Sequence, residues 1–408
     1  MSMQHCENEN DMVVRCAPCD ATPGSVGYDP ERLSFIHRHV QSLIDEKKIW
    51  SGSYCLWKNG KVFADAAIGT LARPWMGNSL FQTDTLFELQ SVGKVFTALA
   101  ILKLMEDGKL HLDQPVKDWI PEFDEGDFRE IKILHLLTHT SGICALEGAY
   151  PQDERNWQDK MDPKDPEHTW INAVVKAGLH AKPGKLWLYS VVGYQILGEI
   201  IKRASGAENA EEFIKQIIFL PCEMRDIHWR KDATEAQLRR YNIANETDLA
   251  MAAKADRSGI QEMAAPTYPT WPGIPDTAGG QMSTCREMMQ LAEMLLRGGT
   301  YRGQRVLGKT VIEFLWTNLI GNDVRDLTFG RNAGIRYGAG MPIYSAEYDR
   351  EQALSEGTIY HEGAGTCVFL VDRREDFAAM FQTSFRKEFD WDFRAVKGLA
   401  TIIWSGLK

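Results

Sequence analysis

The chain has 408 residues, of which 44% are hydrophobic and 25% are charged, so it can form a sizeable core and is not disordered as a whole. Its formal net charge of −10 argues against a nucleic-acid partner, because binding phosphates needs a basic surface. These values leave small-molecule chemistry open and favour one large domain or two closely joined ones.

The N-terminal residues show no targeting signal. The first 14 residues lack a basic region followed by an apolar run, and no stretch reaches the ~18 to 20 apolar residues of a membrane span. With Met1 as the start, we expect a cytoplasmic protein. The eight cysteines are scattered, which predicts free thiols. Cys16 and Cys19 form a single Cys-x-x-Cys without a second pair, so we expect neither a metal nor a cofactor.

The first elements can be read in chain order. Residues 1–27 are polar and rich in turn formers, which predicts a flexible tail. Asp29-Pro30-Glu31 then opens a helical pattern that continues to Leu43, with a proline at its start. Residues 53–69 read as two strands around Asn59-Gly60, a strong hairpin signal.

In the rest of the chain the spacing of apolar residues changes twice. The middle, about 91–324, is mostly helical, whereas residues 358–384 read as a strand, a tight turn at 372–376 and a second strand. A last amphipathic helix follows at about 391–404. We therefore predict an α+β fold in which strands from both chain ends form one antiparallel sheet flanked by helices. Residues 28–90 and 325–408 would form this sheet domain and residues 91–324 a helical domain, with the active site in the cleft between them.

Ser91 and Lys94 are the first candidate reactive pair. From Val95 the apolar positions recur at helical spacing, so Ser91 falls at the first turn of a helix and Lys94 one turn later, on the same face. A buried lysine can take the proton of a serine hydroxyl, and the first backbone N–H groups of the helix can hold an oxyanion. Ser-x-x-Lys occurs three times in this chain, and the alternative for Ser91 is a plain helix cap beside an outward lysine.

Several longer segments decide between these alternatives, because they match one superfamily in order. The chain resembles the class C β-lactamases, penicillin-binding proteins and family VIII carboxylesterases in the segments 84–123, 131–143, 183–201, 278–299, 337–341 and 361–372. The resemblance implies a β-lactamase/transpeptidase-like fold. It also implies that Ser91 is the nucleophile, that Lys94 is its base, and that Tyr189 relays the proton to the leaving group.

The resemblance also covers the family's third motif. His361-Glu362-Gly363 stands where that motif lies on an edge strand lining the cleft. The backbone N–H groups of Ser91 and Ala364 would then form the oxyanion hole, which stabilises the developing negative charge of the transition state.

Two departures from the family pattern bear on the substrate. The family's peptidases and lactamases usually carry Asn two residues after the tyrosine, and this chain has Val191. Their third motif usually begins with Lys followed by Thr or Ser, which bind the substrate carboxylate. Here His361 is mostly neutral at pH 7, and Glu362 would repel an anion if it faced the cleft.

These departures favour a carboxylesterase or acyl transferase acting on small to medium acyl esters through an acyl-enzyme. The alternatives are an amide-bond hydrolase of the same scaffold, such as a β-lactamase or D-amino-acid peptidase, and a penicillin-binding-like sensor without turnover. We expect a small-molecule ester or amide as the partner, no nucleic acid and no membrane span. The sequence is compatible with a homo-oligomer.

Other residues are assigned by position. Tyr268 and Trp271 lie in the Pro-rich segment 266–276, just before the 278–299 block, and either form a substrate wall or belong to a rigid surface loop. His135 and His139 lie in a helix-and-turn segment, and the resemblance implies a structural role for both.

Overall fold

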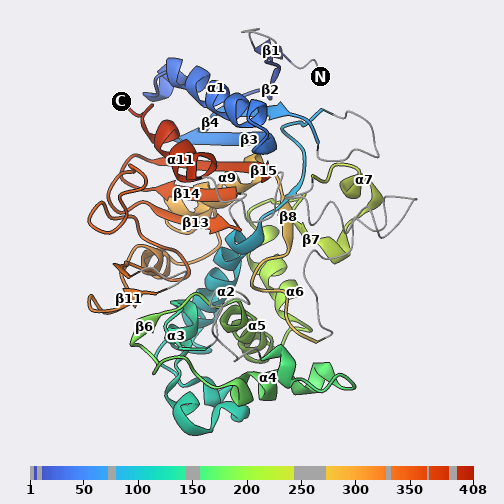
Figure 1. The fold of residues 1–408 in the computed structure, drawn as a ribbon, viewed down its shortest axis with the longest axis vertical. Coiled ribbons are helices and arrows are strands. Elements are labelled where there is room, and N and C mark those ends of the chain that lie inside the picture. The colour runs from blue at the N-terminus through green and yellow to red at the C-terminus, as the bar shows by residue number, and fades with distance from the viewer. Residues whose placement is uncertain are drawn as a thin grey trace.

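A seven-stranded antiparallel sheet forms one end of the molecule (Figure 1). Its strands follow the order β1-β2-β4-β3-β15-β14-β13. They span β1 (Gln4–Cys6), β2 (Val14–Cys16), β3 (Ile49–Lys58), β4 (Lys61–Gly69), β13 (Ile359–Gly363), β14 (Cys367–Asp372) and β15 (Phe377–Phe385). The structure, a computed structural model, describes residues 4–6, 12–71, 80–143, 157–242, 273–327, 332–364, 367–385 and 393–408.

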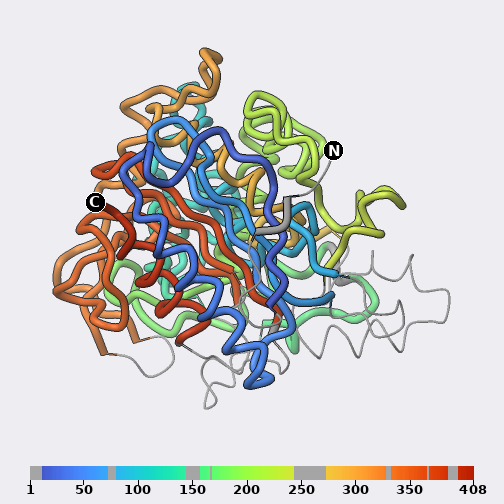
Figure 2. Tube along the Cα trace, turned by 90° about the horizontal axis from the view of Figure 1, so that it is seen from above, coloured from blue at the N-terminus to red at the C-terminus, as the bar shows by residue number. Residues whose placement is uncertain are grey.

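The sheet joins the two ends of the chain at its centre. β3 pairs with β15, with Tyr54 opposite Phe381, so N-terminal and C-terminal segments lie side by side (Figure 2). β3 also pairs with β4 through the predicted hairpin. Asn59 and Gly60 both have positive φ, +53° and +84°, which is the backbone that a two-residue type I′ turn requires. The predicted antiparallel sheet built from both chain ends is therefore confirmed.

Helices cover both faces of this sheet (Figure 1). One face packs against α1 (Glu31–Asp45) and α11 (Lys397–Trp404), whereas α9 (Cys285–Leu296) packs against the other. α1 begins directly after Pro30, and its Ile36 and Val40 are buried one helical turn apart against the strands. Burial of these apolar faces, rather than intrinsic helix propensity, holds the outer helices in place.

Among the described residues, the other α-helices and strands lie between β4 and β13. The helices are α2 (Lys94–Glu106), α3 (Ile133–Leu137), α4 (Pro166–Ala177), α5 (Val191–Ser205), α6 (Ala210–Ile214), α7 (Glu235–Leu238) and α10 (Lys309–Ile312). The short strands are β5 (Phe87–Glu88), β6 (Leu186–Trp187), β7 (His228–Trp229), β8 (Gln281–Ser283), β9 (Thr300–Tyr301), β10 (Gln304–Arg305), β11 (Arg325–Asp326) and β12 (Ala333–Gly334). The described residues after β15 begin with a 3₁₀ turn (Phe393–Ala395), and α11 follows; it ends at Trp404, where the predicted final helix ends, and begins at Lys397 rather than near 391.

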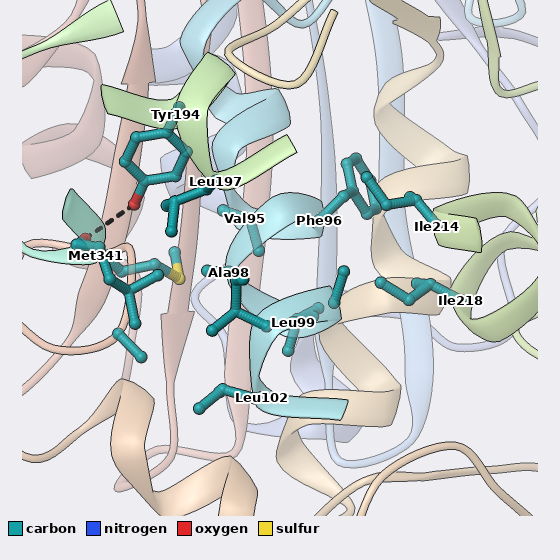
Figure 3. Packing of buried hydrophobic residues seen from close by; sticks show 14 of the residues in the cluster. Val95, Phe96, Ala98, Leu99, Leu102, Tyr194, Leu197, Ile214, Ile218 and Met341 are labelled. Carbon is teal, nitrogen blue, oxygen red and sulfur yellow. Dashed lines mark hydrogen bonds between the residues drawn. The ribbon is translucent and has the colours of Figure 1, made fainter. Parts of the chain in front are cut away.

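α2 is the central helix of this region. Its residues 94–102 are all buried, so the helix is surrounded by other elements on every side. Figure 3 shows Phe96 meeting Ile214 and Ile218 on one side of α2, with Tyr194 and Met341 on another. A helix packed in this way can hold a polar group at its first turn in a fixed place.

Two boundaries differ from the sequence prediction. The flexible tail predicted for residues 1–27 is wrong for the parts that the structure describes, 4–6 and 12–27: β1 pairs with β2, β2 pairs with β4, and Val14 and Val26 are buried. A strand of three residues is too short to give a periodic signal, and pairing with β4 stabilises it. α9 falls inside the predicted helical domain 91–324 but packs on the sheet.

Within the part of the chain that the structure describes, no helix has the length and apolar character needed to cross a membrane.

Candidate active site

Ser91 lies in a 3₁₀ turn (Gln90–Gly93) that leads directly into α2. Before the turn, the Leu89 N–H donates a 2.8 Å hydrogen bond to the Gln281 carbonyl, which ties the segment to β8. Gln90 has a positive φ of +49°, and a Cβ on Gly93 would lie 1.8 Å from Gln281 Oε1. The turn is therefore held tightly against β8, and Ser91 stands half-buried one turn earlier than the regular helix.

Lys94, the first residue of α2, is fully buried beside Ser91. Its Nζ donates to Ser91 Oγ at 3.0 Å and to the Ala278 carbonyl at 2.7 Å. Burial lowers the pKa of this ammonium from 10.5 to about 7, while the charge of Asp276 raises it. Near neutral pH a large share of the Lys94 side chains is therefore uncharged amine, the form that can accept a proton from the Ser91 hydroxyl.

Tyr189 stands over this pair. Its ring centroid lies 4.9 Å from Lys94 Nζ. Tyr189 immediately precedes Ser190, the N-cap residue of α5. Ser190 caps that helix, because its Oγ accepts a 3.1 Å hydrogen bond from the Gly193 N–H. Tyr194 also faces Lys94, but its hydroxyl donates to the Leu137 carbonyl at 2.9 Å. The structure thus brings Ser91, Lys94 and the Tyr189 ring together.

The third motif lies on β13, the last strand of the sheet, which ends beside the Ser91 turn. A Cβ on Gly363 would lie 2.5 Å from the Leu89 carbonyl oxygen and 3.0 Å from Gln90 Cβ, so β13 and the turn are in close contact. His361 and Gly363 share the strand face that points to this side, because side chains alternate along a strand.

Glu362 faces the other way, which corrects its predicted position in the site. It pairs with Val368, a member of the cluster packed under α1 and α11, whereas His361 pairs with Phe369 of the cluster around α2 and α9. Directly opposed residues of antiparallel strands point to the same face. The Glu362 carboxylate therefore does not line the Ser91 side of the strand.

His361 is a neutral hydrogen-bond acceptor in this site. The side chain is 3% exposed, and its Nδ1 lies 2.8 Å from the Glu362 carbonyl oxygen. A carbonyl only accepts, so Nδ1 carries the proton and Nε2 presents a lone pair. Nε2 is buried and has no partner among the described residues. Burial, together with the nearby charge of Lys94, lowers the pKa of this imidazole to about 3, so the ring is uncharged at neutral pH.

Comparison with known proteins assigns the chain to a family. The sequence profile of the Beta-lactamase family matches residues 36–399. The chain belongs to this family. It is a serine hydrolase of the β-lactamase family, and its relatives include both esterases and penicillin-binding proteins.

Three similar proteins show this range. A penicillin-binding protein of Bacillus subtilis strain 168 is 33% identical over 198 residues, which is 46% of this chain and 41% of the relative. Esterase EstB of Burkholderia gladioli is 38% identical over 151 residues, 35% of this chain and 38% of the esterase. These alignments span about two fifths of each relative's length. The solved structure of EstCE1, a hydrolase with promiscuous acyltransferase activity, is 20% identical with a TM-score of 0.71, covering 91% of this chain and 98% of that one.

The remaining predicted residues of the serine hydrolase are placed as follows. Ala364 follows β13 in a left-handed backbone, with φ +41°, and its N–H stays the predicted partner of the Ser91 N–H in an oxyanion hole. Val191 is the half-buried first residue of α5. Tyr268 and Trp271 lie outside the described residues. Among the described residues, no group of three or more His, Cys, Asp and Glu side chains could hold a metal ion.

The sequence did not predict the groups that set the protonation state of Lys94. The Ala278 carbonyl accepts from Lys94, and the carboxyl of Asp276 acts on its charge. Burial and the charges of Glu88 and Glu211 raise the pKa of Asp276 to about 7. The one signal in the sequence that could have found this role is an acid two residues before the 278–299 block of the family pattern.

The shifted lysine predicts how activity depends on pH. If Lys94 is the base, as predicted, only its neutral amine can accept the serine proton. We then expect kcat/KM on an uncharged ester to rise about tenfold per pH unit below a midpoint near pH 7 and to level off above it. A pH–rate profile from pH 5 to 9 measures this, with circular dichroism at each pH to show that the protein stays folded.

Asp276→Asn is the matched variant for this profile. Removing the negative charge that raises the Lys94 pKa should move the midpoint to lower pH. A flat wild-type profile between pH 5 and 9, or a midpoint that moves to higher pH in Asp276→Asn, would contradict the assignment of Lys94 as the base.

Proposed function

We propose that this serine hydrolase is a carboxylesterase or acyl transferase for esters of small to medium acyl groups. The observation that carries the proposal is His361, a neutral acceptor at the position where penicillin-hydrolysing members of the family carry a lysine for the substrate carboxylate. An uncharged imidazole provides no counter-ion for a carboxylate, so it favours neutral esters over β-lactams and peptide C-termini. Val191 supports the same direction, because a valine side chain cannot hydrogen-bond a substrate amide.

The first half-reaction transfers the acyl group to the enzyme. Ser91 Oγ attacks the ester carbonyl carbon while its proton moves to Lys94 Nζ, 3.0 Å away. The resulting oxyanion accepts hydrogen bonds from the N–H groups of Ser91 and Ala364. When the carbon–oxygen bond of the ester breaks, the proton passes from Lys94 by way of the Tyr189 hydroxyl to the leaving alkoxide, which departs as the alcohol.

The second half-reaction reverses these roles. Water or another alcohol gives its proton to the Tyr189 and Lys94 pair and attacks the acyl carbon, and Ser91 leaves with a proton restored to its oxygen. Attack by water gives a carboxylic acid, and attack by an alcohol gives a new ester. EstCE1, whose reported activities are hydrolysis and acyl transfer, supports the view that one site can carry both outcomes.

A substrate panel tests the proposal. We expect p-nitrophenyl acetate and butyrate to be hydrolysed with kcat/KM at least about 100-fold above that for nitrocefin, because a missing counter-ion for its carboxylate and a missing amide contact each weaken binding by about tenfold or more. For D-alanyl p-nitroanilide, which carries no carboxylate, we expect kcat/KM at least about tenfold below that for the esters, because only the amide contact is missing. Faster turnover of nitrocefin or of the D-alanyl amide would overturn the proposal in favour of an amide-bond hydrolase. A stable adduct on Ser91 without product release would indicate a sensor instead.

A further inference from the structure

His139 is bound to the residues on both sides of Tyr189. It follows α3, more than forty residues before Tyr189 in the chain. The Leu188 N–H donates to the His139 carbonyl at 2.8 Å, and the Ser190 N–H donates to His139 Nδ1 at 3.1 Å. His139 thus fixes the backbone of the residue before Tyr189 and of the residue after it.

The imidazole of His139 also contacts the Tyr189 ring itself. The two ring centroids lie 4.5 Å apart with an interplanar angle of 35°. Tyr194 packs at 5.0 Å from the imidazole, while Trp187 and Tyr337 meet it edge-on at 5.5 Å each. His139 is fully buried within these four aromatic rings, so the ring against which Tyr189 rests has little freedom to move.

The backbone of His139 is arranged to make both contacts. Its φ is +57°, in the left-handed region, which is strained for a non-glycine residue. This conformation turns the carbonyl oxygen and Nδ1 of the same residue to one segment of chain, residues 188–190. Next to it the hydroxyls of Thr138 and Thr140 lie 2.9 Å apart and hydrogen-bond, which helps to fix the turn.

The protonation state of His139 separates its role from proton transfer. Nδ1 accepts the Ser190 N–H, so it carries no proton, and the proton of the neutral ring is on Nε2. Burial and the charges of Lys94 and His361 lower the pKa of the imidazole well below 6.5. The ring therefore stays neutral across the working pH range and touches Tyr189 rather than the Ser91 hydroxyl.

We propose that His139 is a positioning residue for the reaction, which holds the Tyr189 phenol over Lys94 through two backbone hydrogen bonds and one ring contact. The proposal rests on the proposed role of Tyr189 in proton transfer. A phenol displaced by an ångström no longer lines up with the leaving oxygen, and such a misplacement can lower the rate about 100-fold.

Two substitutions at position 139 separate the side chain from the backbone. Asn tolerates a left-handed φ, and its Oδ1 can take the place of Nδ1 as acceptor for the Ser190 N–H. Gly tolerates the same φ but offers neither acceptor nor ring. We expect His139→Gly to lower kcat about 10- to 100-fold with KM changed less than about threefold, and His139→Asn to stay within about fivefold of wild type.

His135 provides a matched control four residues earlier. Its Nδ1 also accepts a backbone N–H, that of Lys132, at 3.2 Å, and the imidazole is half-buried. His135 is the middle residue of α3, and its side chain bonds the start of that helix rather than the turn that meets Tyr189. His135→Gly should lower Tm by a few degrees, because glycine is a poor helix former, and leave kcat within about twofold. This control shows whether destabilisation alone lowers turnover.

A double-mutant cycle with Tyr189→Phe identifies the route of the effect. If His139 acts through the phenol, His139→Gly should lower kcat by less than about twofold further once the hydroxyl is gone. Should the glycine variant not fold, His139→Ala takes its place in the cycle. Equal losses in the Asn and Gly variants, unchanged kcat in a folded Gly variant, or multiplicative losses in the cycle would overturn the proposal.

The same experiment keeps this proposal distinct from the proposed function. Failure of the wild type to hydrolyse esters would reject the esterase. Full activity of Tyr189→Phe would reject the role of the phenol. If both of those hold and only the His139 variants behave otherwise than expected, the positioning role alone is wrong.

Discussion

Ser91→Ala is expected to lower kcat/KM on p-nitrophenyl esters by at least about 10⁴-fold. In the proposed mechanism the Ser91 oxygen forms the bond to the acyl carbon, and its hydroxyl lies 3.0 Å from Lys94 Nζ. Without it no acyl-enzyme can form, and the residual rate comes only from substrate binding and the oxyanion donors. Intact-mass detection of a fluorophosphonate adduct should find it on the wild type and not on the variant.

The fold should survive this change. Ser91 is only half-buried, alanine adopts the helical backbone of the turn, and Lys94 keeps its hydrogen bond to the Ala278 carbonyl. We therefore expect Tm to shift by only a few degrees, which separates loss of chemistry from loss of structure.

The chain itself supplies the control for this variant. Ser405 and Lys408 have the same Ser-x-x-Lys spacing, but Ser405 is exposed at the end of α11 and its hydroxyl donates to the Ile402 carbonyl at 2.6 Å. Ser405→Ala should keep full activity. An alanine at position 91 that keeps the wild-type rate would show that the nucleophile has been assigned to the wrong residue.

Lys94→Met should remove nearly all activity and yet make the protein more stable. Methionine fills a similar volume without a charge, so α2 stays packed, but no amine remains to take the serine proton. We expect kcat to fall at least about 1,000-fold. At pH 7 we expect Tm to rise by roughly 2 °C or more, because wild-type folding must place an amine with an unfolded pKa of 10.5 where burial lowers it to about 7.

The pH dependence of that stability difference follows from the direction of the shift. Between pH 7 and pH 10.5 the unfolded wild type holds a proton on Lys94 that the folded protein has released, so wild-type stability rises with pH across this window. The Tm advantage of Lys94→Met should therefore be largest at or below pH 7 and should shrink toward pH 10. Differential scanning calorimetry at pH 6, 8 and 9.5 measures this trend.

Lys103→Met on the same helix is the matched control. Lys103 pairs with Asp107 at the surface end of α2 and is not fully buried. The Lys103→Met variant should keep wild-type kcat, and the difference between its Tm and that of the wild type should not shrink as pH rises. A Lys94→Met variant that remains active, or whose Tm advantage grows from pH 7 to pH 10, would exclude a buried lysine base.

The sequence alone determined the features that depend on neighbours within one element. The spacing of Ser91 and Lys94 at the start of an apolar helical pattern predicts that their side chains meet, because residues three apart share a helix face. Asn59-Gly60 predicts the hairpin, because few other residue pairs adopt two positive φ angles. The antiparallel sheet from both chain ends followed from strand patterns at the two ends.

Only the tertiary structure decided what surrounds those residues. The pKa of Lys94 depends on its burial and on Asp276, and its Nζ bonds the Ala278 carbonyl, both far away in the chain. Tyr189 is held over Lys94 by the turn at His139. The strand at 14–16 and the outward direction of Glu362 depend likewise on which elements lie beside them. Hydrogen bonds within helices and turns join residues a few positions apart, so they leave a pattern in the local sequence. Desolvation and ring packing depend on segments far apart in the chain, and no local pattern in the sequence shows that these segments lie side by side.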